Sequence, residues 1–256
     1  MAVKIQGQGE PILFLHSSVS SHRQWAPLMA QLAALERFCL ISADLTGYGD
    51  EPCPTSPRPF SLAAEVEYLL QRLPDELIQQ PLRVVGHSYG GAVALQLALS
   101  SRGKVRQLAL FEPVAFHLLK GESALWHEVT ALAEELPRLT PERAAQRFID
   151  YWQSPGYFLA LPAKMQHALA AQVTKVSLDF EALANAPWTL ADYQQRLQLP
   201  VWIGSGLDSR QSARRIAQIL AQALAQVQYA EFRCGHMGPV TDGVAINQAL
   251  IEFLTH

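Results

Sequence analysis

Two patterns of hydrophobic and polar residues alternate along most of the chain. Segments in which apolar residues recur every three or four positions are typical of amphipathic helices. Such segments occupy residues 22–35, 61–73, 89–101, 209–226 and 242–255. Short apolar runs rich in Val, Ile, Leu and Phe predict buried strands. These runs occupy residues 12–16, 38–43, 82–86, 105–111, 200–204 and 227–232.

The alternation of strands and helices predicts an α/β fold with a mainly parallel sheet. Crossover helices that join parallel strands cover both faces of such a sheet. The alternation stops between Val114 and Leu197, where no convincing strand is found. Helical patterns there span roughly residues 122–136, 141–153 and 179–196.

The position of this helical segment between two strands suggests an insertion. We expect residues 114–196 to form a helical cap over one edge of the sheet. Residues 1–113 and 197–256 would then form the α/β core. An ordinary helical subdomain is the plainer alternative.

Composition narrows the function classes. The chain is 49% hydrophobic and 17% charged, with a formal net charge of −3 and scattered basic residues, so we expect no nucleic-acid partner. Cys39, Cys53 and Cys234 lie far apart and form neither a metal-binding spacing nor a disulfide framework. No signal peptide or membrane span is expected. These features predict a soluble cytoplasmic protein, monomeric or homodimeric, that does not bind membranes.

One serine stands among glycines between a predicted strand and a predicted helix, in Gly86-His87-Ser88-Tyr89-Gly90. In a parallel sheet, this junction lies at the edge where ligands bind. The two outer glycines allow a sharp turn, which would hold Ser88 in a strained conformation with its hydroxyl exposed. A glycine-rich turn that merely packs helix against strand is the alternative, but the flanking elements favour a nucleophile.

A serine hydroxyl needs a base at neutral pH, and the base needs an acid to fix its tautomer. His236 is the best candidate base, because it follows the last predicted strand beside the flexible Gly235. Asp208, in the loop after the penultimate strand, is the favoured acid. Glu112, directly after the predicted strand that follows residues 89–101, is the alternative acid.

Five motifs, "HSS", "DLTGYG", "GHSYGG", "GLD" and "GHMGP", occur in an order that resembles α/β-hydrolase-fold serine hydrolases of the capped, esterase-like kind. The family order Ser…Asp…His matches Ser88, Asp208 and His236. The resemblance implies that the backbone amides of Ser18 and Tyr89 form the oxyanion hole. Ser17 replaces a common glycine, and it could tighten the loop, add a hydroxyl donor or be neutral.

The resemblance also implies a reaction. Because position 88 is Ser rather than Asp, the dehalogenase and epoxide hydrolase chemistries lose their nucleophile. We expect acyl transfer to water without a metal or organic cofactor, with carboxylic esters as the first substrate class. Lactones, thioesters, amides and substrates of carbon–carbon cleavage are the next substrate classes. Since eleven residues precede "ILFLH", the family's first strand, and part of its second, would be missing, which leaves open how the sheet edge is covered.

Aromatic residues of the cap and of the sheet edge predict an apolar pocket for a small or medium acyl group. The candidates, together with Ser17, are Trp25, Trp126, Tyr151, Trp152, Tyr157 and Trp188. Each alone could instead belong to the packed core of the helical layer. Two other functions stay open: a sensor that binds a hydrophobic ligand with little turnover, and a structural partner that has lost catalysis.

Overall fold

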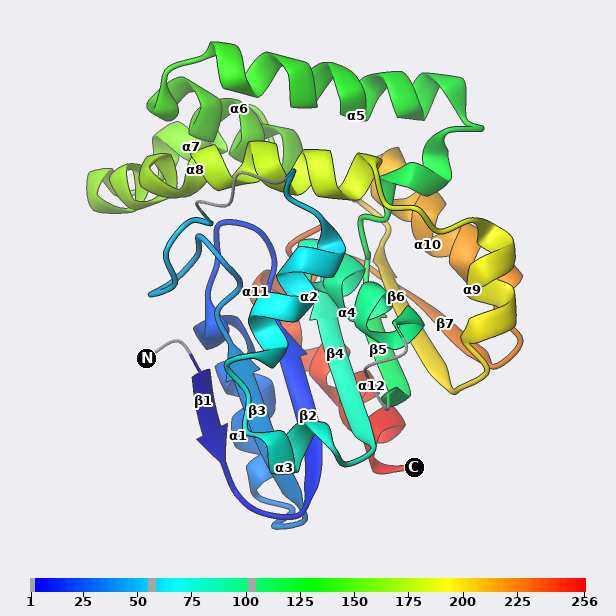
Figure 1. Cartoon of the computed structure of the whole chain (residues 1–256). Coiled ribbons are helices and arrows are strands. Elements are labelled where there is room, and N and C mark those ends of the chain that lie inside the picture. The colour runs from blue at the N-terminus through cyan, green and yellow to red at the C-terminus, as the bar shows by residue number, and fades with distance from the viewer. Residues whose placement is uncertain (1–2, 55–58, 101–104) are drawn as a thin grey trace.

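A computed structural model describes residues 3–54, 59–100 and 105–256. Its centre is a seven-stranded sheet in the order β1-β3-β2-β4-β5-β6-β7 (Figure 1). Strand β1 pairs antiparallel with β3, and all other neighbouring strands are parallel. The strands are β1 (Val3–Gln6), β2 (Glu10–Leu15), β3 (Phe38–Ala43), β4 (Leu82–His87), β5 (Val105–Phe111), β6 (Val201–Gly206) and β7 (Val227–Phe232). The predicted α/β fold is confirmed.

Strand β1 shows how the sheet edge beside β3 is covered. Val3 pairs with Ala43 and Gln6 pairs with Leu40, so the residues before β2 add a short antiparallel strand. This strand is mostly exposed and has no apolar run, which is why its sequence did not predict it. A short, exposed outer strand is a common way to end a sheet.

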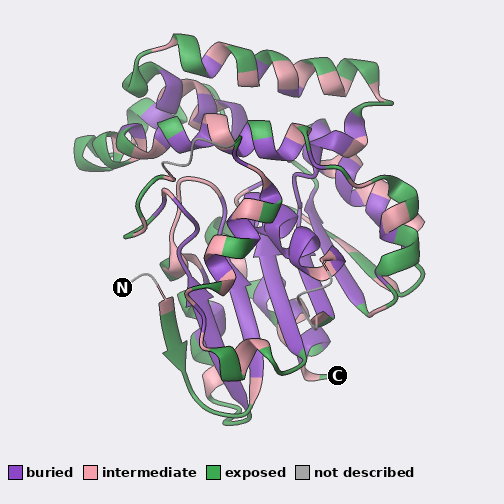
Figure 2. Ribbon diagram, viewed as in Figure 1, coloured by how far each residue is buried: buried purple, intermediate pink, exposed green. Residues whose placement is uncertain are grey.

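Helices cover both faces of the sheet because successive strand residues point to opposite sides. On one face, Leu13 and Leu15 pack in the same core as α2 (Leu62–Leu70), α4 (Tyr89–Leu99) and α10 (Gln211–Ala223). On the other face, Ile12 and Phe14 pack with α1 (Ala26–Ala33) and α12 (Gly243–Thr255). Figure 2 shows the central strands buried along almost their whole length. Three short helices, η1 (His22–Trp25), α3 (Asp75–Ile78) and α11 (Gly238–Thr241), lie in the connections.

The chain between β5 and β6, all of which the structure describes, forms helices joined by short loops and contains no strand. It contains η2 (Phe116–Leu119), α5 (Ser123–Glu135), η3 (Leu136–Arg138), α6 (Pro141–Trp152), α7 (Tyr157–Ala160), α8 (Ala163–Ala184) and α9 (Leu190–Arg196). Helices α5 to α8 lie above the carboxyl ends of the strands in Figure 1. Helix α9 instead contacts α10 beside the sheet.

The predicted helix over residues 179–196 is wrong, because the structure has two helices there. Helix α8 begins after Pro162 and ends at Ala184, and α9 begins at Leu190. Pro187 separates them, since proline lacks a donor and disfavours helical backbone in the residue before it. The alanine-rich stretch after Pro162 is the sequence feature that indicates a helix beginning before residue 179. Ser101, the last residue of another predicted helix, lies outside the described residues.

The turn between β4 and α4 requires glycine because there is no space for a Cβ atom. A Cβ on Gly90 would lie 2.5 Å from the carbonyl oxygen of Leu15 and would also overlap that of His16. A Cβ on Gly86 would lie 2.5 Å from the carbonyl oxygen of Gly90. These neighbours are backbone atoms of β2, of the loop after it and of α4, so they cannot move aside. The two glycines therefore let the turn sit directly against the loop after β2.

Replacing Gly90 tests this packing. Gly90→Ala should lower the free energy of unfolding by about 2–3 kcal/mol, because the methyl group overpacks the contact with β2. Gly121→Ala is the matched control, since nothing lies within 4 Å of a Cβ there, and it should change stability by less than about 0.5 kcal/mol. Urea denaturation followed by tryptophan fluorescence measures both. Equal stabilities of the two variants would contradict the packing argument.

Candidate active site

Ser88 stands at the apex of the turn between β4 and α4, as the sequence predicted. Its backbone has φ 54° and ψ −119°, a conformation that is strained for a residue with a side chain. Its amide donates to the carbonyl oxygen of Phe111, 3.0 Å away at the end of β5. The side-chain oxygen points toward His236, and Ser88 Oγ lies 2.8 Å from His236 Nε2.

The other ring nitrogen of His236 contacts Glu112. His236 Nδ1 donates to Glu112 Oε2 over 2.6 Å. Glu112 is fully buried, and its second oxygen accepts from Gly206 N at 2.7 Å and from Ser205 Oγ at 2.9 Å. This arrangement fixes His236 as the Nδ1–H tautomer, because a carboxylate only accepts hydrogen bonds. Its Nε2 is then free to accept the proton of Ser88.

Asp208 lies in the loop after β6, as predicted, but the expected contact with His236 is wrong, and the alternative, Glu112, makes it. Asp208 is exposed, and its backbone amide donates to Cys234 O at 3.0 Å. Among the described residues, the carboxylate bonded to His236 is that of Glu112. Glu112 directly follows β5, which lies between β4 and β6, and with a φ of 42° its side chain runs along the sheet edge toward β6. The carboxylate thereby reaches the end of β6 and makes the contact predicted for Asp208.

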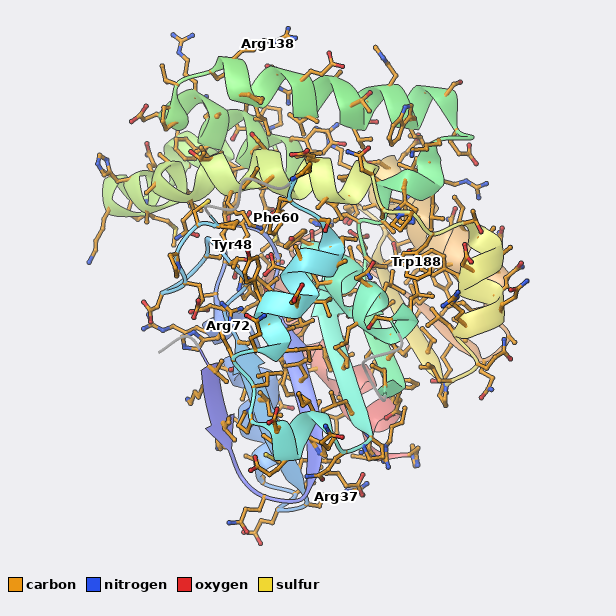
Figure 3. The ribbon with its side chains drawn as sticks, in the orientation of Figure 1. Arg37, Tyr48, Phe60, Arg72, Arg138 and Trp188 are labelled. Carbon is orange, nitrogen blue, oxygen red and sulfur yellow. The ribbon has the colours of Figure 1, made fainter. Side chains whose placement is uncertain are left out.

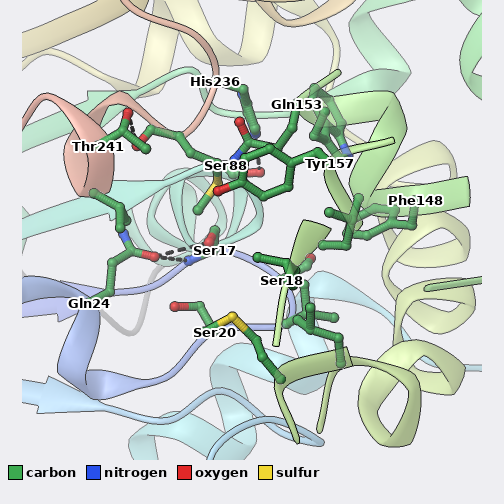
Figure 4. A pocket seen from close by; sticks show the side chains of 18 residues that line it. Ser17, Ser18, Ser20, Gln24, Ser88, Phe148, Gln153, Tyr157, His236 and Thr241 are labelled. Carbon is green, nitrogen blue, oxygen red and sulfur yellow. Dashed lines mark hydrogen bonds between the residues drawn. The ribbon is translucent and has the colours of Figure 1, made fainter. Parts of the chain in front are cut away.

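A second histidine joins two loops behind the site. His87 Nε2 donates to the carbonyl oxygen of His236 at 2.8 Å, and Gln24 Nε2 donates to His87 Nδ1 at 3.1 Å. Gln24 Oε1 in turn accepts from the amide and the hydroxyl of Ser17, both at 3.0 Å (Figure 4). Of the alternatives for Ser17, tightening of the loop fits this geometry, because its hydroxyl proton is used within the protein.

His16 holds the same loop from the other side. Its Nδ1 donates to Ser17 O at 2.7 Å, and its Nε2 accepts from Leu45 N at 2.9 Å. Burial lowers the pKa of His16 to about 4. Burial, followed by the charge of His236, lowers the pKa of His87 well below its usual value. Both histidines therefore support the site as neutral rings.

The two residues predicted to supply the oxyanion hole lie beside Ser88. Tyr89 is the first residue of α4, where the first amides of a helix have no partner within it. Ser18 follows Ser17 in the loop after β2, and both line the same cavity as Ser88. The arrangement leaves the predicted role of the two amides open to test.

A cavity of about 230 Å³ opens next to Ser88 and His236 (Figure 4). Of the predicted pocket residues, Ser17, Trp152 and Tyr157 line it. Aliphatic side chains that the sequence analysis did not single out form much of the remaining wall. They are Val19, Ile149, Leu161, Met165, Leu169, Met237 and Val240. Apart from His236, none of the described residues that line the cavity is a His, Lys, Arg, Asp or Glu.

Four predicted pocket aromatics lie elsewhere. Trp25 is buried on the face of the sheet that α1 and α12 cover, and it donates to Leu15 O at 3.0 Å. Tyr151 bonds Glu128 and Ser212, Trp188 bonds Gln96, and Trp126 lies under the ammonium of Lys120. Their large apolar surfaces stabilise packing between layers, which was the plainer alternative for each.

Trp152 contacts His236, the predicted base, directly. Its ring stacks on the His236 ring with centroids 4.1 Å apart and planes 24° from parallel. Because Trp152 ends α6, the helical segment between β5 and β6 supplies one wall around the imidazole. His236 is thus enclosed by Glu112, His87 and Trp152, with Ser88 at its remaining nitrogen.

The fold and these motifs define a family. The model of the alpha/beta hydrolase family matches residues 12–249, and the chain belongs to this family. Among curated proteins, it is 30% identical over 133 residues to the 2-hydroxymuconate semialdehyde hydrolase of a Pseudomonas species, covering 50% of this chain and 46% of that protein. It is 34% identical over 113 residues to the pimeloyl-(acyl-carrier protein) methyl ester esterase of Aeromonas hydrophila, covering 42% of this chain and 40% of that protein. Each match spans less than half of the relative's own length.

Solved structures share the whole fold. The enol-lactonase from Burkholderia xenovorans superposes with a TM-score of 0.80 at 19% identity, over 99% of this chain and 96% of that one. A thermophilic esterase from Thermogutta terrifontis gives a TM-score of 0.79 at 21% identity, over 99% and 92% of the two chains. Within the residues that the structure describes, no helix has both the length and the apolar character needed to cross a membrane.

The state of His16 gives a test of the site's supporting bonds. His16 should stay a neutral Nδ1–H tautomer with a titration midpoint near pH 4, because burial disfavours the charged ring and Nε2 must accept from Leu45. Between about pH 6.5 and 4 the unfolded chain alone takes up this proton, so folding is destabilised as the pH falls. Long-range ¹H–¹⁵N spectra measure tautomer and midpoint, with His16→Gln to assign the signal. A midpoint near 6.5 would contradict the structure.

Proposed function

We propose that the protein is a serine hydrolase that transfers the acyl group of a small or medium, uncharged, apolar carboxylic ester to water. The observation that carries this proposal is the series of hydrogen bonds from Ser88 through His236 to Glu112 at the wall of an apolar cavity. A nucleophile, a base and an acid in this geometry suit acyl transfer.

In the first half of the reaction, Ser88 Oγ attacks the ester carbonyl carbon while His236 Nε2 takes the hydroxyl proton. The buried carboxylate of Glu112 stabilises the imidazolium that forms. The amides of Ser18 and Tyr89 bind the negative oxygen of the tetrahedral intermediate. His236 then gives its proton to the leaving alcohol as the carbon–oxygen bond breaks, which leaves an acyl group on Ser88.

In the second half, His236 takes a proton from a water molecule whose oxygen attacks the acyl carbon. The same two amides bind the second oxyanion, and the proton returns to Ser88 as the carboxylic acid leaves. Each step uses one proton that moves between Ser88, His236 and the substrate or water. The chemistry balances without a metal or an organic cofactor.

The residues that line the cavity favour an uncharged substrate. A buried carboxylate costs several kcal/mol unless it has a partner. Of the residues that the structure describes, no Lys, Arg, Asp or Glu lines the cavity, so a charged acyl group would lack a partner there. One relative is named a 2-hydroxy-6-oxo-2,4-heptadienoate hydrolase, and a heptadienoate carries a carboxylate. The uncharged wall therefore favours ester hydrolysis over carbon–carbon cleavage of such an acid.

Ser88→Ala tests the nucleophile. On p-nitrophenyl butyrate the substitution should lower kcat by about 10⁴-fold or more, because it removes the atom that forms the acyl-enzyme. The negatively charged p-nitrophenyl hemisuccinate, with an acyl chain of similar length, should show a kcat/KM at least about 30-fold below that of the butyrate, since about 2 kcal/mol of desolvation is uncompensated. Release of p-nitrophenol measures both.

Two outcomes would contradict this assignment. Turnover that persists in Ser88→Ala would place the chemistry elsewhere. A folded wild-type protein that binds the esters without hydrolysing any of them would instead support a ligand-binding sensor.

A comparison of Glu112→Gln with Asp208→Asn tests which residue is the acid that partners His236. Glu112→Gln should lower kcat by about 10⁴-fold, because the amide cannot stabilise the imidazolium or enforce the Nδ1–H tautomer. Asp208→Asn is the matched control, and its exposed side chain should leave kcat within about threefold. Steady-state hydrolysis of p-nitrophenyl butyrate gives both values. A severe loss in Asp208→Asn with a mild one in Glu112→Gln would reverse the roles.

A further inference from the structure

A cluster of charged residues is buried beneath the loop after β2. Lys175 and Asp179 stand one turn apart on α8, Glu65 stands on α2, and each is at most 1% exposed. Lys175 Nζ donates to Asp179 Oδ1 and, over 3.2 Å, to Glu65 Oε2. The cluster therefore joins the helical segment to the core by ion pairs that have no access to solvent.

Three aromatic rings surround the ammonium group. Lys175 Nζ lies 4.4 Å from the ring centroid of Phe60, 4.6 Å from that of Tyr89 and 5.1 Å from that of Tyr48. Figure 3 places Tyr48 and Phe60 beneath α8, near the upper end of α2. Ring faces attract a desolvated cation. Burial opposes the charge of Lys175, but Asp179 and Glu65 outweigh it, and the pKa of Lys175 is raised.

The two predicted oxyanion residues are both attached to this cluster by their side chains. Ser18 Oγ donates to Asp179 Oδ2 at 2.6 Å. Tyr89 Oη donates to Glu65 Oε2 at 2.9 Å and lies 3.4 Å from Lys175 Nζ. The amide of Ser18 belongs to the loop after β2 and that of Tyr89 to the start of α4, and the cluster bonds the side chains of both residues.

The remaining acceptors of the cluster are used by the loop after β3. Glu65 Oε1 accepts from Thr46 N at 2.9 Å, and Asp179 Oδ2 also accepts from the hydroxyl of Tyr48. Gly47 has φ 79°, and a Cβ there would lie 2.7 Å from Lys175 Cγ. Every carboxylate oxygen of the cluster thus has a donor, and the loop is closed against the lysine stem.

We propose that Lys175 and Asp179 are positioning residues that hold the amides of Ser18 and Tyr89 in the geometry that binds the oxyanion. Helix α8 is then part of the catalytic machinery as well as a wall of the cavity. This inference rests on the proposed acyl transfer. It differs from a purely structural role, because a structural cluster would affect folding and leave the transition state of the folded enzyme unchanged.

Two conservative variants and their combination test the proposal. Asp179→Asn keeps the shape of the side chain and removes its charge, and Ser18→Ala removes the hydroxyl and leaves the amide. Arg147→Met is the control, since it breaks a surface ion pair of 2.9 Å with Glu135 in the same helical segment. The measurements are kcat and KM on p-nitrophenyl butyrate, the rate at which a fluorophosphonate labels Ser88, and the melting temperature.

Loss of one oxyanion donor costs about 10²- to 10³-fold in kcat, so a misplaced donor should cost less. We expect kcat to fall about 10- to 100-fold in Asp179→Asn and about 10-fold in Ser18→Ala, with KM within about threefold. Labelling of Ser88 should slow in parallel. Because Ser18 acts through Asp179, the double variant should be no slower than Asp179→Asn alone. Arg147→Met should change kcat by less than about twofold.

Other outcomes would overturn the proposal. A lower melting temperature with unchanged kcat and an unchanged labelling rate would show a purely structural cluster. If Asp179→Asn does not fold, the kcat and labelling rate of Ser18→Ala test the proposal in its place. Losses that multiply in the double variant would show independent roles. If the wild type is labelled at Ser88 but hydrolyses no ester, the proposed substrate class fails, and the labelling rates of the variants still test positioning. A wild type that is neither labelled nor active would overturn both proposals.

Discussion

The close approach of the β4–α4 turn to the loops around it is the constraint on which the site depends. Gly90 lies against the backbone of Leu15 and His16, and a Cβ on the neighbouring Gly91 would lie 3.0 Å from Pro113. The carbonyl oxygen of Ser88 also accepts from Val114 N at 3.3 Å. One turn therefore touches the loop after β2 and the loop after β5. This contact brings a strained serine, a carboxylate and the predicted oxyanion amides to one place.

Charge in this site lies behind the cavity. Apart from His236, the wall that a substrate would touch is lined by apolar and uncharged polar residues. The carboxylate of Glu112 bonds His236 in the cavity wall, and the Lys175 cluster bonds Ser18 in the same wall through Asp179. A low dielectric strengthens each of these interactions, but it would also penalise any charge left without a partner. The complete set of donors around the buried carboxylates meets that requirement.

Local sequence patterns were enough for most of the fold. Apolar runs gave six strands, and the glycines around Ser88 indicated a strained turn before it was seen at φ 54°. The position of His236 after the last strand was also sufficient to place it near Ser88. These features depend on residues close together in the chain, where spacing constrains geometry.

Features that depend on distant residues were not predictable in this way. Asp208 and Glu112 both follow strands that end at the same edge, and the choice depends on the positive φ of Glu112 and on donors from β6. Trp25 and Tyr151 resemble pocket residues in sequence, yet they pack between layers. The charged cluster joins Glu65 to Lys175, which is 110 positions further along the chain. No local pattern marks such a pair.

The stacking of Trp152 on His236 shows why the helical segment and the core act as one unit. In the proposed mechanism, His236 becomes an imidazolium each time Ser88 gives up its proton. An aromatic face attracts a cation, whereas a simple aliphatic wall would only remove water from it. At 4.1 Å between centroids, Trp152 covers one face of the His236 ring with an aromatic surface. Glu112 supplies the remaining stabilisation through Nδ1, so the base is set jointly by β5 and by the end of α6.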